Sequence, residues 1–228
     1  IIAFIVITLT PLAFAGDGQI DIASLPYTIT EPGSYVVVAN LTLTDLDTDG
    51  ITIDADDVTV DLNGHTLTGP GSAAGTSGNG IRAGDGGLVS RSRITVHGGT
   101  VTGFRQRGIW LFGGRNVVRD MIVHDNGWDG INCESTALIS DCIVTQSGLA
   151  GISAGAGSII SRCIAEVNGG SGISTGGSVI IVQNNCRQNT GFGIEASNAL
   201  VAENTCVSNT AGTFSVFFST SVDNHTAP

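Results

Sequence analysis

The chain contains no lysine: its nine positively charged side chains are all arginine, against twenty aspartate and glutamate residues. The resulting net charge of −11 argues against a nucleic acid partner, because binding to a phosphate backbone requires a basic surface. The five cysteines include no C-x-x-C pair, which argues against a zinc ribbon and against thioredoxin-like redox chemistry. At 228 residues, a single domain is the natural interpretation.

Leucine is scarce in the repetitive part of the chain, and this scarcity separates two repeat architectures. Only four leucines occur between residues 108 and 211, whereas a leucine-rich repeat needs leucine at fixed positions and a helix on its outer side. The rest of the stretch is rich in Gly, Ser, Asn and Thr, which oppose helix. Its apolar positions are mostly Ile and Val, which favour strand. The repeat is therefore predicted to consist of strands.

A Gly-Ile pair recurs along this stretch at steps of 22, 21, 21 and 21 residues. The pairs begin at Gly108, Gly130, Gly151, Gly172 and Gly193. A fixed period of about 20 to 50 residues indicates stacked units that share one continuous core. We interpret each unit as one coil of a parallel β-helix, with right-handed crossovers and neighbouring coils about 4.8 Å apart.

Each unit closes at a polar residue, and aligning the units on it produces columns of matched residues. The closing residues are Asn126, Ser147, Asn168, Asn189 and Asn209. Five positions earlier stand Met121, Cys142, Cys163, Asn184 and Asn204. In a stacked coil each inward side chain sits on its equivalent in the next coil, so we expect ladders inside the solenoid. All five cysteines fall at positions predicted to point inward, where a thiol is small core filler.

The stacking of Asn184 over Asn204 resembles the asparagine ladder of pectate-lyase-like β-helices. The segments LPYTITEPGSYVV, GITIDADDVTVDLNGHTLTG and GIRAGDGG are similar to the opening coils of secreted right-handed β-helix repeat proteins of bacteria. The resemblance reaches back to Gly16 and implies an all-β fold, a single-stranded right-handed parallel β-helix of about eight coils. It does not select an activity, because the superfamily holds lyases, hydrolases, epimerases, binding proteins and structural proteins.

We divide the chain into four segments. Residues 1–15, IIAFIVITLTPLAFA, match the apolar region and cleavage site of a secretory signal peptide and are too short to span a bilayer comfortably. Their many β-branched residues allow the alternative of a retained strand that caps the solenoid or pairs with a neighbour. Residues 16–34 are predicted to form a cap, residues 35–212 the β-helix, and residues 213–228 a final strand or cap. We expect a secreted protein, extracellular or at the cell surface.

Asp45, Asp47 and Asp49 stand at alternate positions, followed by a glycine. This arrangement resembles the start of a calcium-binding loop. Asp56 occupies the position at which such a loop carries glutamate, and no helical pattern flanks the segment. The sequence therefore leaves two alternatives, a calcium site or an acidic outer turn without an ion, so the expected cofactor is calcium or none.

Asp120 and Asp141 share an outward column, and stacked coils would place them about 5 Å apart. Such a pair could bind a cation, or act as acid and nucleophile in a retaining glycosidase. Arg119 and Arg162 are close enough in the alignment to compensate both carboxylates. The alternative is a solvated charged face without chemistry.

The richest turn is His124-Asp125-Asn126-Gly127-Trp128-Asp129, which joins a titratable ring, two carboxylates and an aromatic side chain. Tryptophan can stack on a sugar face and arginine can pair with a sugar carboxylate. We therefore expect an acidic sugar to bind near Trp110, Trp128, Arg105, Arg107 and Arg119. The candidate catalytic residues are His124, Asp125, Asp120 and Asp141. The alternative is that this turn only closes a coil.

Two functions follow as hypotheses. The first is a non-enzymatic extracellular module, structural or binding, because the core is regular and no complete catalytic set is present. Apolar strand-forming residues at both termini suggest head-to-tail assembly into filaments, because a solenoid exposes unpaired backbone groups at its ends. The second is a polysaccharide-active lyase or glycosidase that works on acidic glycans through the face formed by residues 105–145. The expected partner is a second copy of the chain or an extracellular polysaccharide.

Overall fold

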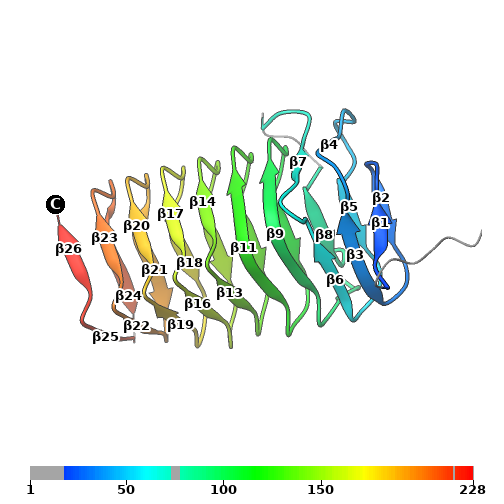
Figure 1. The fold of residues 1–228 in the computed structure, drawn as a ribbon. Helices are drawn as coiled ribbons and strands as arrows, with labels where there is room; N and C mark the ends of the chain where they lie inside the picture. Colours follow the sequence, from blue (N-terminus) through cyan, green and yellow to red (C-terminus); the bar gives the residue numbers. More distant parts are fainter. Residues whose placement is uncertain (1–17, 73–77, 218, 228) are drawn as a thin grey trace, which may run out of the picture.

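The chain is a parallel β-solenoid of nine coils (Figure 1). The computed structural model describes residues 18–72, 78–217 and 219–227, so the predictions for residues 1–15 lie outside the described part. In these ranges the secondary structure consists of strands and contains no helix. Every strand pairing is parallel, as the alternation of Ile- and Val-rich segments with Gly- and Asn-rich turns predicts. No helix among the described residues is long and apolar enough to cross a membrane.

One wall of the solenoid is a nine-stranded sheet with one strand per coil. Its strands are β2 (Tyr27–Ile29), β5 (Ile51–Ile53), β8 (Ile81–Ala83), β10 (Ile109–Leu111), β12 (Ile131–Cys133), β15 (Ile152–Ala154), β18 (Ile173–Thr175), β21 (Phe192–Ser197) and β24 (Gly212–Phe217). The sequence predicts about eight coils. The difference lies mainly at the carboxyl-terminal end, because the segment from Thr213 onward, predicted to be a final strand or cap, supplies strands of both sheets and forms a further coil. The segment 16–34, predicted to be a cap, also supplies one strand to each sheet.

The second sheet has seventeen strands and bends into two legs. The first leg contains β1 (Ile20–Ile22), β3 (Gly33–Val37), β6 (Val58–Asp61), β13 (Leu138–Ser140), β16 (Ile159–Ser161), β19 (Ile180–Val182), β22 (Leu200–Ala202) and β25 (Thr220–Val222). The second leg contains β4 (Leu41–Thr42), β7 (Thr66–Thr68), β14 (Ile143–Thr145), β17 (Ile164–Glu166), β20 (Asn185–Arg187), β23 (Thr205–Val207) and β26 (His225–Ala227). The longer strands β9 (Thr95–Thr102) and β11 (Val117–His124) run through both legs.

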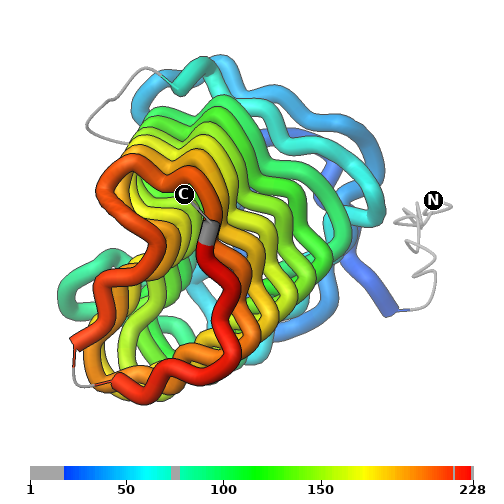
Figure 2. Tube along the Cα trace, turned by 90° about the vertical axis from the view of Figure 1, so that its left-hand side faces the viewer, coloured from blue at the N-terminus to red at the C-terminus, as the bar shows by residue number. Residues whose placement is uncertain are grey.

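The coils stack on one another along the solenoid axis (Figure 2), and the core consists of ladders of inward side chains along that axis. Ile131, Ile152, Ile173 and Ile194 are in register on consecutive strands of the nine-stranded sheet, and each is completely buried. This register confirms the period inferred from the Gly-Ile pairs. All five cysteines are buried as free thiols, in agreement with their inward columns.

The corners of each coil turn on residues with left-handed backbone conformation. Between the two legs the corner row is Asp120, Asp141, Arg162, Gln183, Glu203 and Asp223, with φ between 48° and 60°. After the second leg it is Asp125, Gln146, Val167, Gln188 and Ser208, with φ between 53° and 57°. This conformation bends the chain within one residue, so two short strands can meet at a sharp corner.

Asparagine side chains inside two corners hold neighbouring coils together. Asn184 donates its backbone N–H to Oδ1 of Asn204 at 2.9 Å, and its Nδ2 donates to the carbonyl of Ile160 at 3.0 Å. Asn168 and Asn189 repeat the pattern at the other corner, where the N–H of Asn168 donates to Oδ1 of Asn189 at 3.0 Å. The ladders pair buried backbone groups that the strands leave free at the turns.

Candidate functional site

Two outward rows of polar and charged side chains cross the nine-stranded sheet over its earlier coils. The middle residues of β8, β10 and β12 are Arg82, Trp110 and Asn132, which are in register and lie between buried residues on each strand. The second row precedes the glycine of each Gly-Ile pair and consists of Asp49, Asn79, Arg107 and Asp129. Alternation along a strand places the middle residue outside whenever its two neighbours are inside.

Arg107 lies between two tryptophan rings. Its guanidinium carbon is 4.6 Å from the ring centroid of Trp110 and 4.9 Å from that of Trp128. Both distances are within the range of cation–π attraction, which is strongest for tryptophan. The Arg107 side chain is 18% exposed, so the charge is fixed in place while part of it still meets solvent. We call Arg107, Trp110 and Trp128 the arginine–tryptophan cluster.

Asp129 holds the arginine–tryptophan cluster against the wall. Its Oδ2 accepts from Nε of Arg107 at 3.4 Å and from Nδ2 of Asn132 at 3.1 Å, and its Oδ1 accepts from the backbone N–H of Ala150 at 3.2 Å. The Asp129 side chain is only 12% exposed, so it is a nearly buried carboxylate with three partners. Such partners offset the loss of hydration that burial imposes on a polar group. Asp129 therefore fixes the direction in which Arg107 points.

The network continues into the preceding coils through Asp49. The Asp49 carboxylate pairs with Arg82 and accepts from the backbone N–H and Nδ2 of Asn79 at 2.7 and 2.8 Å. Oδ1 of Asn79 in turn accepts from the backbone N–H of Arg107 at 3.3 Å. The two outward rows are thus bonded to each other from the coil of Asp49 to the coil of Asn132.

Residues 84–90 form a loop that follows β8 and borders the arginine–tryptophan cluster. The loop projects beyond the outline of the coils and is the teal loop at the lower left of Figure 2. Oδ1 of Asp85 accepts from the N–H groups of Gly87 and Val89 at 2.9 and 2.8 Å, and these bonds lower the pKa of Asp85. A Cβ added at Gly86 would lie 2.5 Å from Cη2 of Trp110, so only glycine allows this approach. The indole Nε1 of Trp110 is buried without a partner among the described residues.

Arg105 and Arg119, which we expected beside the tryptophans, occupy other positions. Arg105 lies in the turn before the nine-stranded sheet, and its Nε is buried without a partner in the described part of the chain. Arg119 lies on the first leg, in the row of His97 and Ser140, and pairs with Asp120 at 2.7 Å. The structure therefore brings Arg107 to the tryptophans and places Arg119 on another face.

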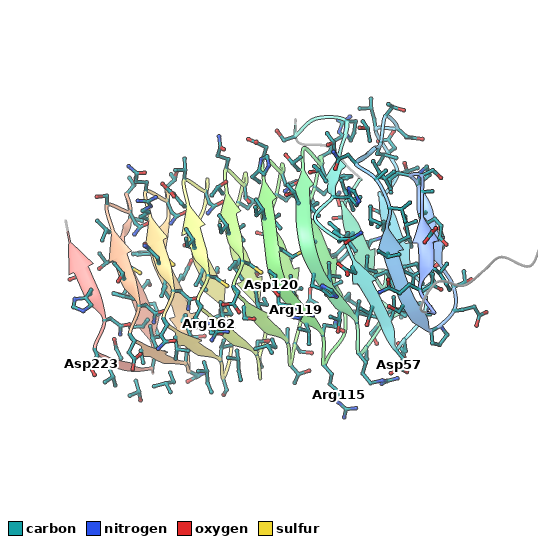
Figure 3. The ribbon with its side chains drawn as sticks, in the orientation of Figure 1. Asp57, Arg115, Arg119, Asp120, Arg162 and Asp223 are labelled. Atoms are coloured by element: carbon teal, nitrogen blue, oxygen red, sulfur yellow. The ribbon has the colours of Figure 1, made fainter. Side chains whose placement is uncertain are left out.

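The candidate acidic pair, Asp120 and Asp141, lies at the corner between the legs, in the row that Figure 3 labels at Asp120, Arg162 and Asp223. Asp141 accepts from Nε and Nη2 of Arg162, both at 2.8 Å, and this bonding lowers its pKa. The two aspartates do share an outward column on consecutive coils, as the alignment predicts. Each is engaged by an arginine and distant in the fold from the nine-stranded sheet.

His124 and Asp125 lie at the end of the second leg, where the turn towards the nine-stranded sheet begins. Nδ1 of His124 is 2.7 Å from Oδ2 of Asp125 and 3.1 Å from the hydroxyl of Thr102. These contacts are local to one corner and include neither tryptophan. The catalytic role proposed for the two residues stays a prediction.

Asp45, Asp47 and Asp49 differ in their surroundings. Oδ1 of Asp45 accepts the backbone N–H of Asp47 at 2.9 Å within the turn, whereas Asp49 is bonded to Arg82 and Asn79. Among the described residues, no group of three or more His, Cys, Asp and Glu side chains is arranged to hold a metal ion. Calcium binding at these aspartates stays a prediction.

Asp49 was expected only as a calcium ligand and Asp129 only as part of the rich turn. The network that joins them to Arg82 and Asn132 was not predicted, because the residues before each Gly-Ile pair were not compared as a column. Alignment on the Gly-Ile pair would have shown a column with Asp49, Arg107 and Asp129 one position before the glycine. The contact of loop 84–90 with Trp110 has no such signal, since the loop occurs in one coil only.

The protein is thus a parallel β-solenoid that carries a patch of charged and aromatic side chains on one wall. A family model described as a right handed beta helix region matches residues 29–158, which is more than half of the chain. The chain belongs to this family, so the predicted right-handed parallel β-helix is confirmed. A comparison with curated protein sequences finds no match.

Several solved structures share the fold. The enzymatically active domain of tailspike protein 2 of bacteriophage CBA120 has a TM-score of 0.73 and 15% identity, over 92% of this chain and 38% of that chain. The periplasmic alginate epimerase AlgG has a TM-score of 0.67 and 11% identity, over 86% and 51%. The A-module of the Azotobacter vinelandii mannuronan C-5 epimerase AlgE4 has a TM-score of 0.58 and 13% identity, over 92% and 85%. The chain spans less than two thirds of the first two proteins.

Proposed function

We propose that the chain binds an acidic polysaccharide through the outward face of the nine-stranded sheet at β8, β10 and β12. The observation that carries the proposal is the guanidinium of Arg107, held between Trp110 and Trp128 and aimed by Asp129. Among the described residues, the two terminal nitrogens of Arg107 have no hydrogen-bond partner. A planar guanidinium whose two terminal nitrogens are free to donate matches the geometry of a carboxylate, which can accept two parallel hydrogen bonds.

Local charge supports this location. Residues 78–119 contain seven arginines and one acidic residue, whereas residues 17–61 contain ten acidic residues and no cation. This segment therefore carries an excess of positive charge in an otherwise acidic chain, although Arg82, Arg93, Arg107 and Arg119 are each paired with an aspartate. An anionic polymer would be attracted to this segment and repelled by the coils before it, an effect that weakens with ionic strength.

The names of the structural neighbours also support a glycan as the ligand. Two of them are named as epimerases of alginate or mannuronan, and a third is a tailspike domain named as enzymatically active. One is named as periplasmic, which agrees with a secreted protein that meets an extracellular polysaccharide. Head-to-tail filaments do not form part of the proposal, because that prediction depends on residues 1–15, outside the described part, and no neighbour supports it.

Calorimetric titration with oligomers of mannuronate, guluronate and galacturonate, and with a neutral glucose oligomer of equal length, tests the proposal. Arg107→Ala should weaken binding of at least one acidic oligomer by about 10- to 100-fold, because a hydrogen bond to a charged group contributes about 1.5–3 kcal/mol. Arg107→Lys should recover only part of the affinity, because lysine lacks the planar fork. The matched control is Arg162→Ala, an exposed arginine at the corner between the legs.

Three outcomes would contradict the proposal. The first is an absence of binding to every acidic oligomer, and the second is equal binding of the neutral oligomer. The third is an equal loss in the Arg107 and Arg162 variants, which would indicate nonspecific attraction. Release of unsaturated or reducing ends that disappears in Asp129→Asn would show that the face is catalytic and favour the enzymatic alternative.

A further inference from the structure

A row of exposed aliphatic side chains runs along the first leg, on a different wall from the arginine–tryptophan cluster. Leu138, Ile159, Ile180 and Leu200 occupy matched positions on β13, β16, β19 and β22, and each is 39–40% exposed. We call these four residues the aliphatic ladder. Large apolar side chains that recur at the same outward position on four consecutive coils form a continuous surface, unlike isolated exposed residues.

The residues on both sides of the aliphatic ladder are uncharged. A hollow of about 370 Å³ lies beside three of its rungs, lined by Gly157, Ser158, Ile159, Ser178, Val179, Ile180, Asn198 and Leu200. The next outward row on its other side contains only the small side chains of Ser140, Ser161, Val182 and Ala202. Neither set includes a charged residue, so the ladder and its flanks can be covered without burying an unpaired charge.

The same leg is different in the earlier coils. The matched positions there are Thr59 and Thr95 in the ladder row, and Asp61, His97 and Arg119 in the next row. The change from polar to aliphatic occurs at Val117 and Leu138, although the fold of the leg is unchanged. The inward residues of this leg, such as Val60, Val96 and Ile139, are apolar in the earlier and later coils alike, so the change concerns the outward face alone.

We infer that the aliphatic ladder is a side-by-side contact with the same ladder of a second copy of the chain. Its rungs repeat at the spacing of paired strands, about 4.8 Å. A second copy has the same repeat, so each rung of one ladder can enter the gap between two rungs of the other along its whole length. A peptide strand presents same-face side chains about 6.6–6.8 Å apart and would fall out of step within two coils. The period therefore selects another coil of the same pitch.

The size of the ladder sets the strength of the contact. Four rungs at about 4.8 Å cover roughly 15–20 Å along the axis, and a strip of that length only one or two side chains wide buries less than the about 800 Å² per partner of a standard interface. The dimer should therefore exchange with monomer, and its fraction should rise with protein concentration. Because the same patch is used on both copies, the contact closes at two copies.

Cysteine cross-linking tests the contact without disturbing the core. The native cysteines are all buried, so a thiol introduced by Ile159→Cys or Ile180→Cys is the accessible one. The matched control is Gln188→Cys, which places a thiol at an exposed polar corner after the second leg. Under mild oxidation with oxidised glutathione, disulfide-linked dimer should form at least tenfold faster in the two ladder variants than in the control. Equal rates in all three variants would overturn the inference.

Sedimentation velocity over a concentration series gives an independent measurement. The parent chain should show a dimer fraction that grows with concentration, and the Ile159→Ser/Ile180→Ser variant should remain monomeric at every concentration. Circular dichroism and the melting curve establish that this variant is folded. A monomeric parent at all concentrations, or a parent and variant with the same dimer fraction, would overturn the inference.

Discussion

Single residues with left-handed conformation determine where each coil turns. Asparagine and aspartate tolerate this conformation better than other non-glycine residues, and β-branched residues tolerate it worst. In the row after the second leg the residues are Asp125, Gln146, Val167, Gln188 and Ser208. Val167 has φ of 57° and is 47% exposed, so its strain is not offset by a fully buried side chain.

Replacing Val167 by asparagine should stabilise the chain. The left-handed conformation is disfavoured by roughly 1–2 kcal/mol for ordinary residues, and asparagine recovers much of that. The hydrogen bond from the Val167 N–H to the carbonyl of Arg187, 3.1 Å long, is unaffected by the substitution. We expect a free energy of unfolding about 1 kcal/mol higher by urea titration. Val207→Asn, in strand β23, is the control and should destabilise. A loss of stability in Val167→Asn would show that packing of the valine outweighs its strain.

The ion pair of Asp141 should make stability depend on pH in the acid range. Arg162 lowers the pKa of Asp141 below its ordinary value of 3.8. A carboxyl group whose pKa is lower in the folded state stabilises the fold above its ordinary pKa, and this contribution disappears as the pH falls through the lowered value. Arg162→Gln should therefore melt below the parent at neutral pH and together with it in strong acid, by a small amount because the pair is exposed. A difference in melting temperature that is independent of pH would contradict this.

At the scale of strands, the inward ladders contribute most of the packing. Ile152→Asp in β15 would place an unpaired charge between Ile131 and Ile173, both completely buried, and should destabilise by several kcal/mol. Ser153→Asp, at the outward position of the same strand, is the matched control and should change stability by less than about 0.5 kcal/mol. Urea unfolding measures both. An Ile152→Asp variant as stable as the parent would mean that the coil register is wrong.

The strands and their register could be predicted from the sequence because stacking imposes one period on every coil. The Gly-Ile pair marks the start of a strand in the five coils from Gly108 to Gly193, and the asparagine columns mark the corners. The candidate site could be predicted only in part. Trp110, Trp128 and Arg107 were expected together, but the position of Arg119 on the first leg depends on the turn between β10 and β11, which carries the chain from one wall to the next. The role of Asp129 depends on contacts across three coils, which a pattern within one coil does not show.

At the scale of the whole molecule, charge is distributed in three zones along the axis. Residues 17–61 carry ten acidic residues, residues 78–119 carry seven arginines and one acidic residue, and residues 120–228 carry nine acidic residues and two arginines. The zones have net charges of −10, +6 and −7, which add up to −11. Ion pairs join the first two zones across coils, as between Asp49 and Arg82. A long anionic chain would therefore be held at the middle zone and repelled at both sides.

The later coils have nearly the translational symmetry of a one-dimensional crystal, and the candidate site lies where that symmetry is broken. Loop 84–90 occurs once, and Phe104 stands where later coils carry an asparagine. Because these features occur once, a ligand that recognises them can bind at only one position along the axis. The aliphatic ladder lies in the symmetric part, where a shift by one coil restores all but one of its contacts. In the proposed dimer, a second copy could therefore slide by one coil at the loss of one of the four rungs, whereas the proposed glycan site has a single position along the axis.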